Sequence, residues 1–223
     1  RIPNAVALIN AGSNIALVLG PILGGLLFDY FGPEGAYVLV ASLYILSGSA
    51  TLLIGATRTS ESVRGESVFT MVGQGLRYVK GEQLLWSALL VAVIFNITGF
   101  SFHTTLVPIF AKDVLYRDSV GLGILISSFG IGGLVGSMVW ASIPNLRHIG
   151  LLCILAVMGW HSTMILFAAS TNFYFSVGIL VVTGMLFSSS LVLVLTVLMK
   201  TGRPEFRGRL MGLRTLAIYA HAF

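Results

Sequence analysis

Residues 173–198 of the sequence read FYFSVGILVVTGMLFSSSLVLVLTVL, without one Asp, Glu, Lys or Arg. An α-helix rises 1.5 Å per residue, so about 20 residues cross a hydrocarbon core of roughly 30 Å. The stretch exceeds that length and stays apolar almost throughout. A transmembrane barrel strand would instead alternate apolar and polar residues over about 10 positions. Residues 173–198 therefore predict a membrane-spanning α-helix.

The same pattern repeats along the chain. Charged clusters and turn signals divide the sequence into seven apolar runs. The predicted spans are residues 8–28, 35–56, 85–108, 119–141, 149–169, 173–198 and 210–223, the seventh being incomplete. They predict an all-α membrane protein, a polytopic transmembrane helix bundle. The chain starts at Arg1 and stops within an apolar run, so we expect an internal portion of a longer protein.

Composition points the same way. The 223 residues are 56% hydrophobic and only 9% charged, and the mean hydropathy is +0.95. A soluble domain carries roughly 25% charged residues, because its surface must face water. The composition excludes an ordinary soluble enzyme, a nucleic-acid-binding domain and a disordered chain, and makes the lipid bilayer the main partner. The single cysteine, Cys153, cannot form an internal disulfide or a zinc site, and we expect no metal or cofactor.

Basic residues set the orientation. The loops on one side of the predicted spans hold ten Lys and Arg residues, and the loops on the other side hold two. The ten are Arg1, Arg58, Arg64, Arg77, Lys80, Arg147, Lys200, Arg203, Arg207 and Arg209; the two are Lys112 and Arg117. Because cytoplasmic loops carry the excess of positive charge, the ten-residue side is predicted to be cytoplasmic.

The longest loop, residues 57–83, contains an amphipathic pattern. Its apolar residues recur mostly at spacings of three and four, while polar and basic residues lie off that stripe. The apolar positions are Val68, Met71, Val72, Leu76 and Val79. We expect a helix on the inner membrane surface or against the bundle, which either links two bundles or binds a partner or lipid.

Small residues mark two spans. The first span contains glycines that allow a neighbouring helix to approach closely and a proline that is expected to bend the helix. These residues are Gly20, Pro21, Gly24 and Gly25. In the fourth, Gly132 and Gly136 share one helix face. This pattern is consistent either with static packing or with helices that slide and rock against one another.

Four polar side chains are candidates to line a cavity. They are Asn14, Asn96, His103 and His161. Intramembrane ionisable groups are costly, so His161, placed near mid-membrane, has either a proton or substrate role or a packing role through a hydrogen bond. No predicted span holds a buried Asp or Glu. Neither protease and hydrolase motifs nor a Walker motif is present, which argues against an enzyme and against an ATP-driven motor.

Three short segments carry a family resemblance. They read RPEFRGRLMGL at residues 203–213, GPILGG at residues 20–25 and PNAVAL at residues 3–8. The first resembles the loop between helices ten and eleven of the major facilitator superfamily, and the second resembles the fifth-helix motif of its antiporters. The third is most similar to the branch of bacterial exporters that includes the enterobactin exporter. The motif residues in the segment 203–213 are Arg203, Pro204, Glu205, Arg207, Gly208 and Arg209.

The resemblance implies a twelve-helix, two-bundle transporter of which this chain is a fragment. Residues 1–56 would be the last two helices of the first bundle, residues 57–83 the cytoplasmic central loop, and residues 84–223 the first five helices of the second bundle. The implied activity is secondary active, proton-coupled export of a small, partly apolar compound by alternating access, by a monomer in the bacterial inner membrane.

One departure from the resemblance concerns the fifth-helix motif. The family's motif has glycines where this chain has Ala7 and Ala16, so the version of the motif in this chain is less diagnostic of export. Two further hypotheses stay open beside coupled export: a transporter fold that moves lipid or acts as a receptor without ion coupling, and an intramembrane enzyme.

Overall fold

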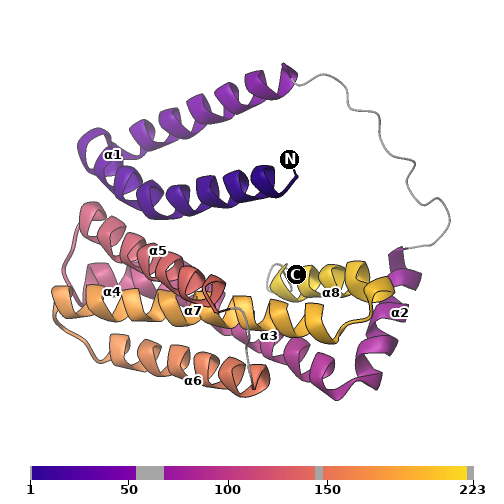
Figure 1. Ribbon diagram of the computed structural model, residues 1–223. Coiled ribbons are helices and arrows are strands. Elements are labelled where there is room, and N and C mark those ends of the chain that lie inside the picture. The colour runs from indigo at the N-terminus through magenta and orange to yellow at the C-terminus, as the bar shows by residue number, and fades with distance from the viewer. Residues whose placement is uncertain (1, 54–67, 144–147, 220–223) are drawn as a thin grey trace.

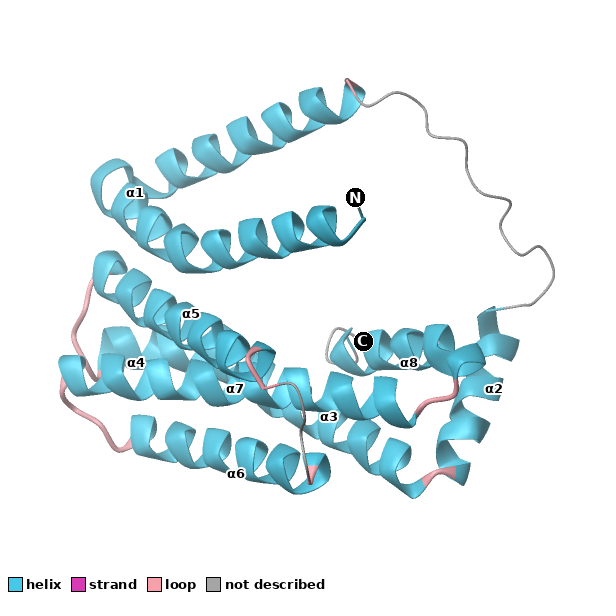
Figure 2. Ribbon diagram, in the orientation of Figure 1, coloured by secondary structure: helices cyan, strands magenta, loops and turns pink. Residues whose placement is uncertain are grey.

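The computed structural model describes residues 2–53, 68–143 and 148–219, which are helical and contain no strand (Figures 1 and 2). The α-helices are α1 (Ile2–Leu52), α2 (Val68–Gly81), α3 (Gln83–Ser101), α4 (Val107–Asp113), α5 (Ser119–Ala141), α6 (Ile149–Ala168), α7 (Phe173–Thr201) and α8 (Arg207–Tyr219). A π-helix, η1 (Phe102–Leu106), joins α3 to α4, and a 3₁₀ turn, η2 (Pro204–Phe206), precedes α8. The prediction of an all-α fold is confirmed.

Helix α1 consists of two arms joined at Gly32. This glycine has φ 69° and ψ −172°, a left-handed conformation that side chains with a Cβ rarely adopt. Pro33 follows it, and its fixed φ with no N–H suits the start of a new helix. Figure 1 shows the second arm folding back beside the first. The predicted spans 8–28 and 35–56 are these two arms.

The third predicted span is longer than expected and contains the π-helix. Helical structure continues from Gln83 to Asp113, whereas the sequence predicts an end near residue 108. Pro108 has no N–H to donate to the carbonyl four residues earlier, so the α-helical ladder is already interrupted at this point. A wider π-turn occupies residues 102–106, and such turns occur frequently at functional sites.

Polar caps start two of the spans. The backbone N–H of Gly121 donates to Asp118 Oδ1 at 2.8 Å at the start of α5. The N–H of Phe175 donates to Asn172 Oδ1 at 3.1 Å at the start of α7. Each cap satisfies one of the amide donors that a helix N-terminus leaves without a partner. The predicted break between spans 149–169 and 173–198 is therefore where α7 begins.

Within the described residues, five helical segments are long and apolar enough to cross a membrane. They are Ile15–Leu52, Gln83–Asp113, Ser119–Trp140, Ile149–Ala168 and Phe173–Thr201. The first contains both arms of α1. Helix α8, at 13 residues, is shorter than the roughly 20 residues of a complete span, and residues 220–223 lie outside the described part.

Packing leaves lipid-facing surfaces apolar. Helix α5 lies between α1 and α7, and α6 packs on the other side of α7 (Figure 1). Large side chains point outward, with Leu52 88% exposed, Ile165 71% and Met158 62%. In water such surfaces would promote aggregation, whereas hydrocarbon is their natural solvent. The chain is a multi-pass membrane protein.

Candidate functional site

Helix α1 meets α5 through glycines on both helices. A Cβ on Gly25 would collide with the carbonyl oxygen of Ser119, and a Cβ on Gly123 would lie 2.5 Å from the carbonyl oxygen of Pro21. Real Cβ atoms essentially never approach within 3.0 Å, so both positions require glycine at this helix separation. A cavity of about 270 Å³ lies beside this contact and is lined by Pro21, Gly24, Gly25, Phe28, Ser119, Leu122, Gly123 and Ile126.

A hydrogen bond crosses the same interface. The buried Ser127 hydroxyl donates to the carbonyl of Val18 at 2.6 Å. One residue earlier, the carbonyl of Leu17 lies against α5, 2.9 Å from the position of a Cβ on Gly130. Pro21 has no N–H to donate to that Leu17 carbonyl. On this side of α1, α5 therefore meets the Leu17 and Val18 carbonyls with a glycine and a hydroxyl.

The predicted glycines of α1 divide into two groups. Gly25 is at the backbone contact with α5, whereas a Cβ on Gly20 or Gly24 would meet no described atom within 4 Å. Gly24 lines the 270 Å³ cavity instead. Sequence spacing shows which residues share a helix face, but the neighbouring helix determines which face is in contact.

The predicted glycines of α5 lie against α7. A Cβ on Gly132 would collide with the Val181 carbonyl oxygen, and one on Gly136 with the Met185 carbonyl oxygen. Gly184 of α7 approaches the backbone of Phe129 in the same way. The backbones of α5 and α7 are therefore in direct contact, as small residues allow in membranes.

Two of the predicted polar residues are hydrogen-bonded within the bundle. Asn96 Nδ2 donates to the carbonyl of Ala92, one turn earlier in its own helix, at 2.8 Å. His161 places Nδ1 2.8 Å from the Val157 carbonyl and Nε2 3.2 Å from Thr98 Oγ1 on α3. The side chain of Asn14 lies outside the described part of the structure.

His103 differs from these residues because its environment is aromatic. It lies in the π-helix, and its ring centroid is 3.9 Å from that of Phe129 on α5. Its Nε2 atom is buried and has no hydrogen-bond partner in the described part of the chain. A buried polar nitrogen without a partner is costly whether it donates or accepts, which makes His103 a candidate ligand contact.

An aromatic cluster separates His103 from His161. Phe187 on α7 lies at its centre, with ring centroids 5.0 Å from Phe95, 5.9 Å from Trp160 and 5.9 Å from His103. The indole Nε1 of Trp160 is also buried without a partner among the described residues. Sequence reasoning missed the rings between His103 and His161, because α3, α6 and α7 each contribute to this group.

The loop motif at residues 203–209 is attached to α2. The ring of Tyr78 stacks on Phe206, with centroids 4.2 Å apart and planes at 17°. The backbone N–H of Arg203 donates to Tyr78 Oη at 3.1 Å, and the guanidinium of Arg209 lies 5.2 Å from the Phe206 ring centroid. Pro204 begins η2, whereas the Glu205 and Arg207 side chains are exposed. Tyr78 joins the predicted amphipathic helix to the predicted loop motif, and no sequence signal links the two.

Comparison with known families agrees with this architecture. Residues 1–223 match the family described as transmembrane secretion effector, which is a family of the major facilitator superfamily. No curated protein matches the chain. The multi-pass helical fold, the glycine-mediated helix contacts and the family match agree with one another. The chain therefore belongs to the transmembrane secretion effector family of major facilitator superfamily transporters.

Proposed function

We propose that this protein exports small, partly apolar compounds across the bacterial inner membrane, is driven by the proton gradient and belongs to the exporter branch that includes the enterobactin exporter. In this proposal residues 1–56 are part of one helical bundle, residues 84–223 are part of the other, and residues 57–83 connect them. The two bundles rock about a site near mid-membrane, as in other transporters built from repeats.

The α1–α5 interface is the observation that carries this proposal. Its contacts run along α5 from Ser119 to Gly130, the half of α5 nearer the predicted outer side. Toward the predicted cytoplasmic side, α5 contacts α7 through Gly132 and Gly136 instead. Among the residues whose side chains the structure describes, which begin at Ile15 in α1, these contacts lie in the outer half of α5, as expected for a transporter closed to the outside.

The surroundings of His103 support a partly apolar substrate. The His103 Nε2 atom, which has no partner among the described residues, offers one directional hydrogen bond, and the neighbouring Phe129 and Phe187 rings offer apolar and stacking surface. Ligand sites generally combine an apolar lining with a few placed polar groups. We assign Asn96, His103 and His161 to the substrate path from the second bundle, and Asn14 to the same path from the first bundle.

Transport into inside-out vesicles tests the proposal. The full-length protein is reconstituted, a panel of fluorescent, partly apolar dyes is added outside, and an inward-acidic proton gradient is imposed. We expect dye accumulation that stops when a protonophore collapses the gradient. Accumulation no greater than in protein-free vesicles across the panel would contradict export.

The lipid-moving alternative rests on a different observation. Residues 119–201, which include α5, α6 and α7, contain no Asp or Glu, and proton coupling usually uses such groups. Movement of a fluorescent phospholipid between leaflets that does not depend on the proton gradient would favour this alternative over coupled export.

A further inference from the structure

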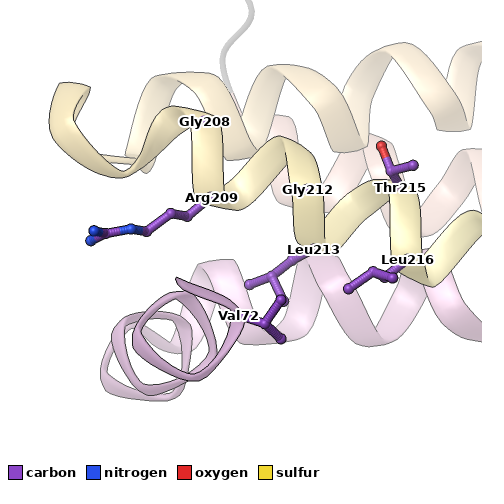
Figure 3. Close-up of a pocket in the computed structure, with 7 residues that line it drawn as sticks. All are labelled: Val72, Gly208, Arg209, Gly212, Leu213, Thr215 and Leu216. Atoms are coloured by element: carbon purple, nitrogen blue, oxygen red, sulfur yellow. The ribbon is translucent and has the colours of Figure 1, made fainter. Parts of the chain in front are cut away.

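A groove lies between α2 and α8 at the predicted cytoplasmic face (Figure 3). Its volume is about 390 Å³, and its lining residues are Val72, Gly208, Arg209, Gly212, Leu213, Thr215 and Leu216. The lining is apolar apart from Arg209 and the Thr215 hydroxyl. A Cβ on Gly208 or Gly212 would meet no described atom within 4 Å, so the two glycines leave open space along α8.

The groove has the shape and polarity of an amphiphile site. From Gly208 to Leu216 the helix advances eight residues, which at 1.5 Å per residue is about 12 Å. Arg209 lies near the end where α8 begins, and its side chain extends away from the apolar lining (Figure 3). Leu213 and Leu216 lie farther along the helix. A cation at the membrane surface and an apolar channel running inward match a lipid headgroup and its acyl chain.

Further positive charge surrounds the headgroup end. Arg203 and Arg209 lie against the stacked Tyr78–Phe206 pair, with guanidinium-to-ring distances of 6.0 and 5.2 Å. Arg77, which directly precedes Tyr78 on α2, is exposed. The anionic headgroups of the cytoplasmic leaflet attract juxtamembrane basic clusters of this kind.

We propose that the groove binds an anionic phospholipid, with its phosphate near Arg209 and Arg203 and one acyl chain along Gly212 and Leu216. The bound lipid would hold α2 against α8, and so connect the central loop to the second bundle. This role goes beyond export, because it concerns lipid regulation of the transporter and needs neither a substrate nor a proton gradient.

Lipid retention by the purified full-length protein tests the proposal. The protein is incubated with equal amounts of phosphatidylglycerol and phosphatidylcholine, and bound lipid is counted by native mass spectrometry. We expect wild type to retain phosphatidylglycerol preferentially. Arg209→Gln should lower this retention about fivefold, the effect of one basic residue near an anionic surface. Gly212→Leu should lower it comparably without changing charge, because the side chain fills the groove.

Two matched controls separate the groove from general effects. Arg117→Gln removes an exposed positive charge on the opposite side, and Gly178→Leu adds the same side chain at an exposed, open position of α7. Both should retain lipid as wild type does. Equal retention of the two lipids by wild type, or unchanged retention in Gly212→Leu, would overturn the proposal. As a second measurement, a photo-reactive amino acid replaces Leu216 in the full-length protein, and we expect it to crosslink to lipid. Crosslinking to protein instead of lipid would also overturn the proposal.

Discussion

Replacing Ser127 by alanine removes the side-chain hydrogen bond that joins α5 to α1. The donor is buried, and its acceptor is the Val18 carbonyl at 2.6 Å. The matched control is the neighbouring Ser128, which is also buried but donates to Leu125 of its own helix at 2.7 Å. Ser128→Ala therefore removes a hydroxyl from the same helix without touching the interface.

The size of the effect follows from one interhelical bond. Hydrogen bonds between membrane helices contribute about 0.6 kcal/mol on average and up to about 1.7 kcal/mol. If the bond exists only in the outer-closed state, its loss shifts the equilibrium toward the outer-open state about threefold, and at most about eighteenfold. Ser127→Thr keeps a hydroxyl and should restore most of the wild-type equilibrium.

Spin labels measure the populations. Cysteines replace Tyr30 and Tyr116, whose side chains are 76% and 85% exposed, in a full-length Cys153→Ser background. Electron–electron distance distributions then give the outer-closed and outer-open fractions. We expect Ser127→Ala to raise the outer-open fraction and Ser128→Ala to leave it near wild type. Identical distributions for the two alanine variants would refute the role of this bond.

Three further experiments test the topology, the helix contacts and the role of His161. Cysteines at Glu82 and Tyr116 should differ in labelling by an impermeant reagent on intact cells, with only position 116 labelled; labelling confined to position 82 would reverse the orientation. Gly25→Leu should lose transport more completely than Gly24→Leu at equal expression, because only Gly25 is in backbone contact with α5; equal rates would count against that contact. His161→Gln should export at nearly the wild-type rate across pH, because its imidazole is bonded to backbone and hydroxyl oxygen; loss of pH dependence would show a proton role.

The membrane spans were predictable because charge is the strongest signal in this sequence. A charged side chain in hydrocarbon is so costly that charge-free runs mark helices directly. Turn signals then placed the breaks, at Gly32 for α1 and at residues 170–172 before α7. The π-helix at residues 102–106 escaped prediction, since Pro108 indicates an interruption of the ladder but not the form it takes.

The candidate site was less predictable because its contacts join distant segments. Polarity alone selected His103, but the rings around it come from helices separated by tens of residues. The Tyr78–Phe206 stack likewise links the amphipathic helix to a loop more than a hundred residues later. The Gly20 and Gly24 spacing indicated a close contact on α1, and the structure places that contact at Gly25, since the face in contact depends on where α5 lies.

Alternating access is tested most directly by two distances measured in the same reconstituted full-length protein. One label pair replaces Tyr30 and Tyr116 on the predicted outer side, and the other replaces Leu52 and Lys200 on the predicted cytoplasmic side. Both pairs are measured at acidic and at alkaline pH. We expect the outer distance to lengthen as the cytoplasmic distance shortens, because the two bundles rock about one site. Distances that stay fixed, or that change in the same direction at both ends, would contradict alternating access.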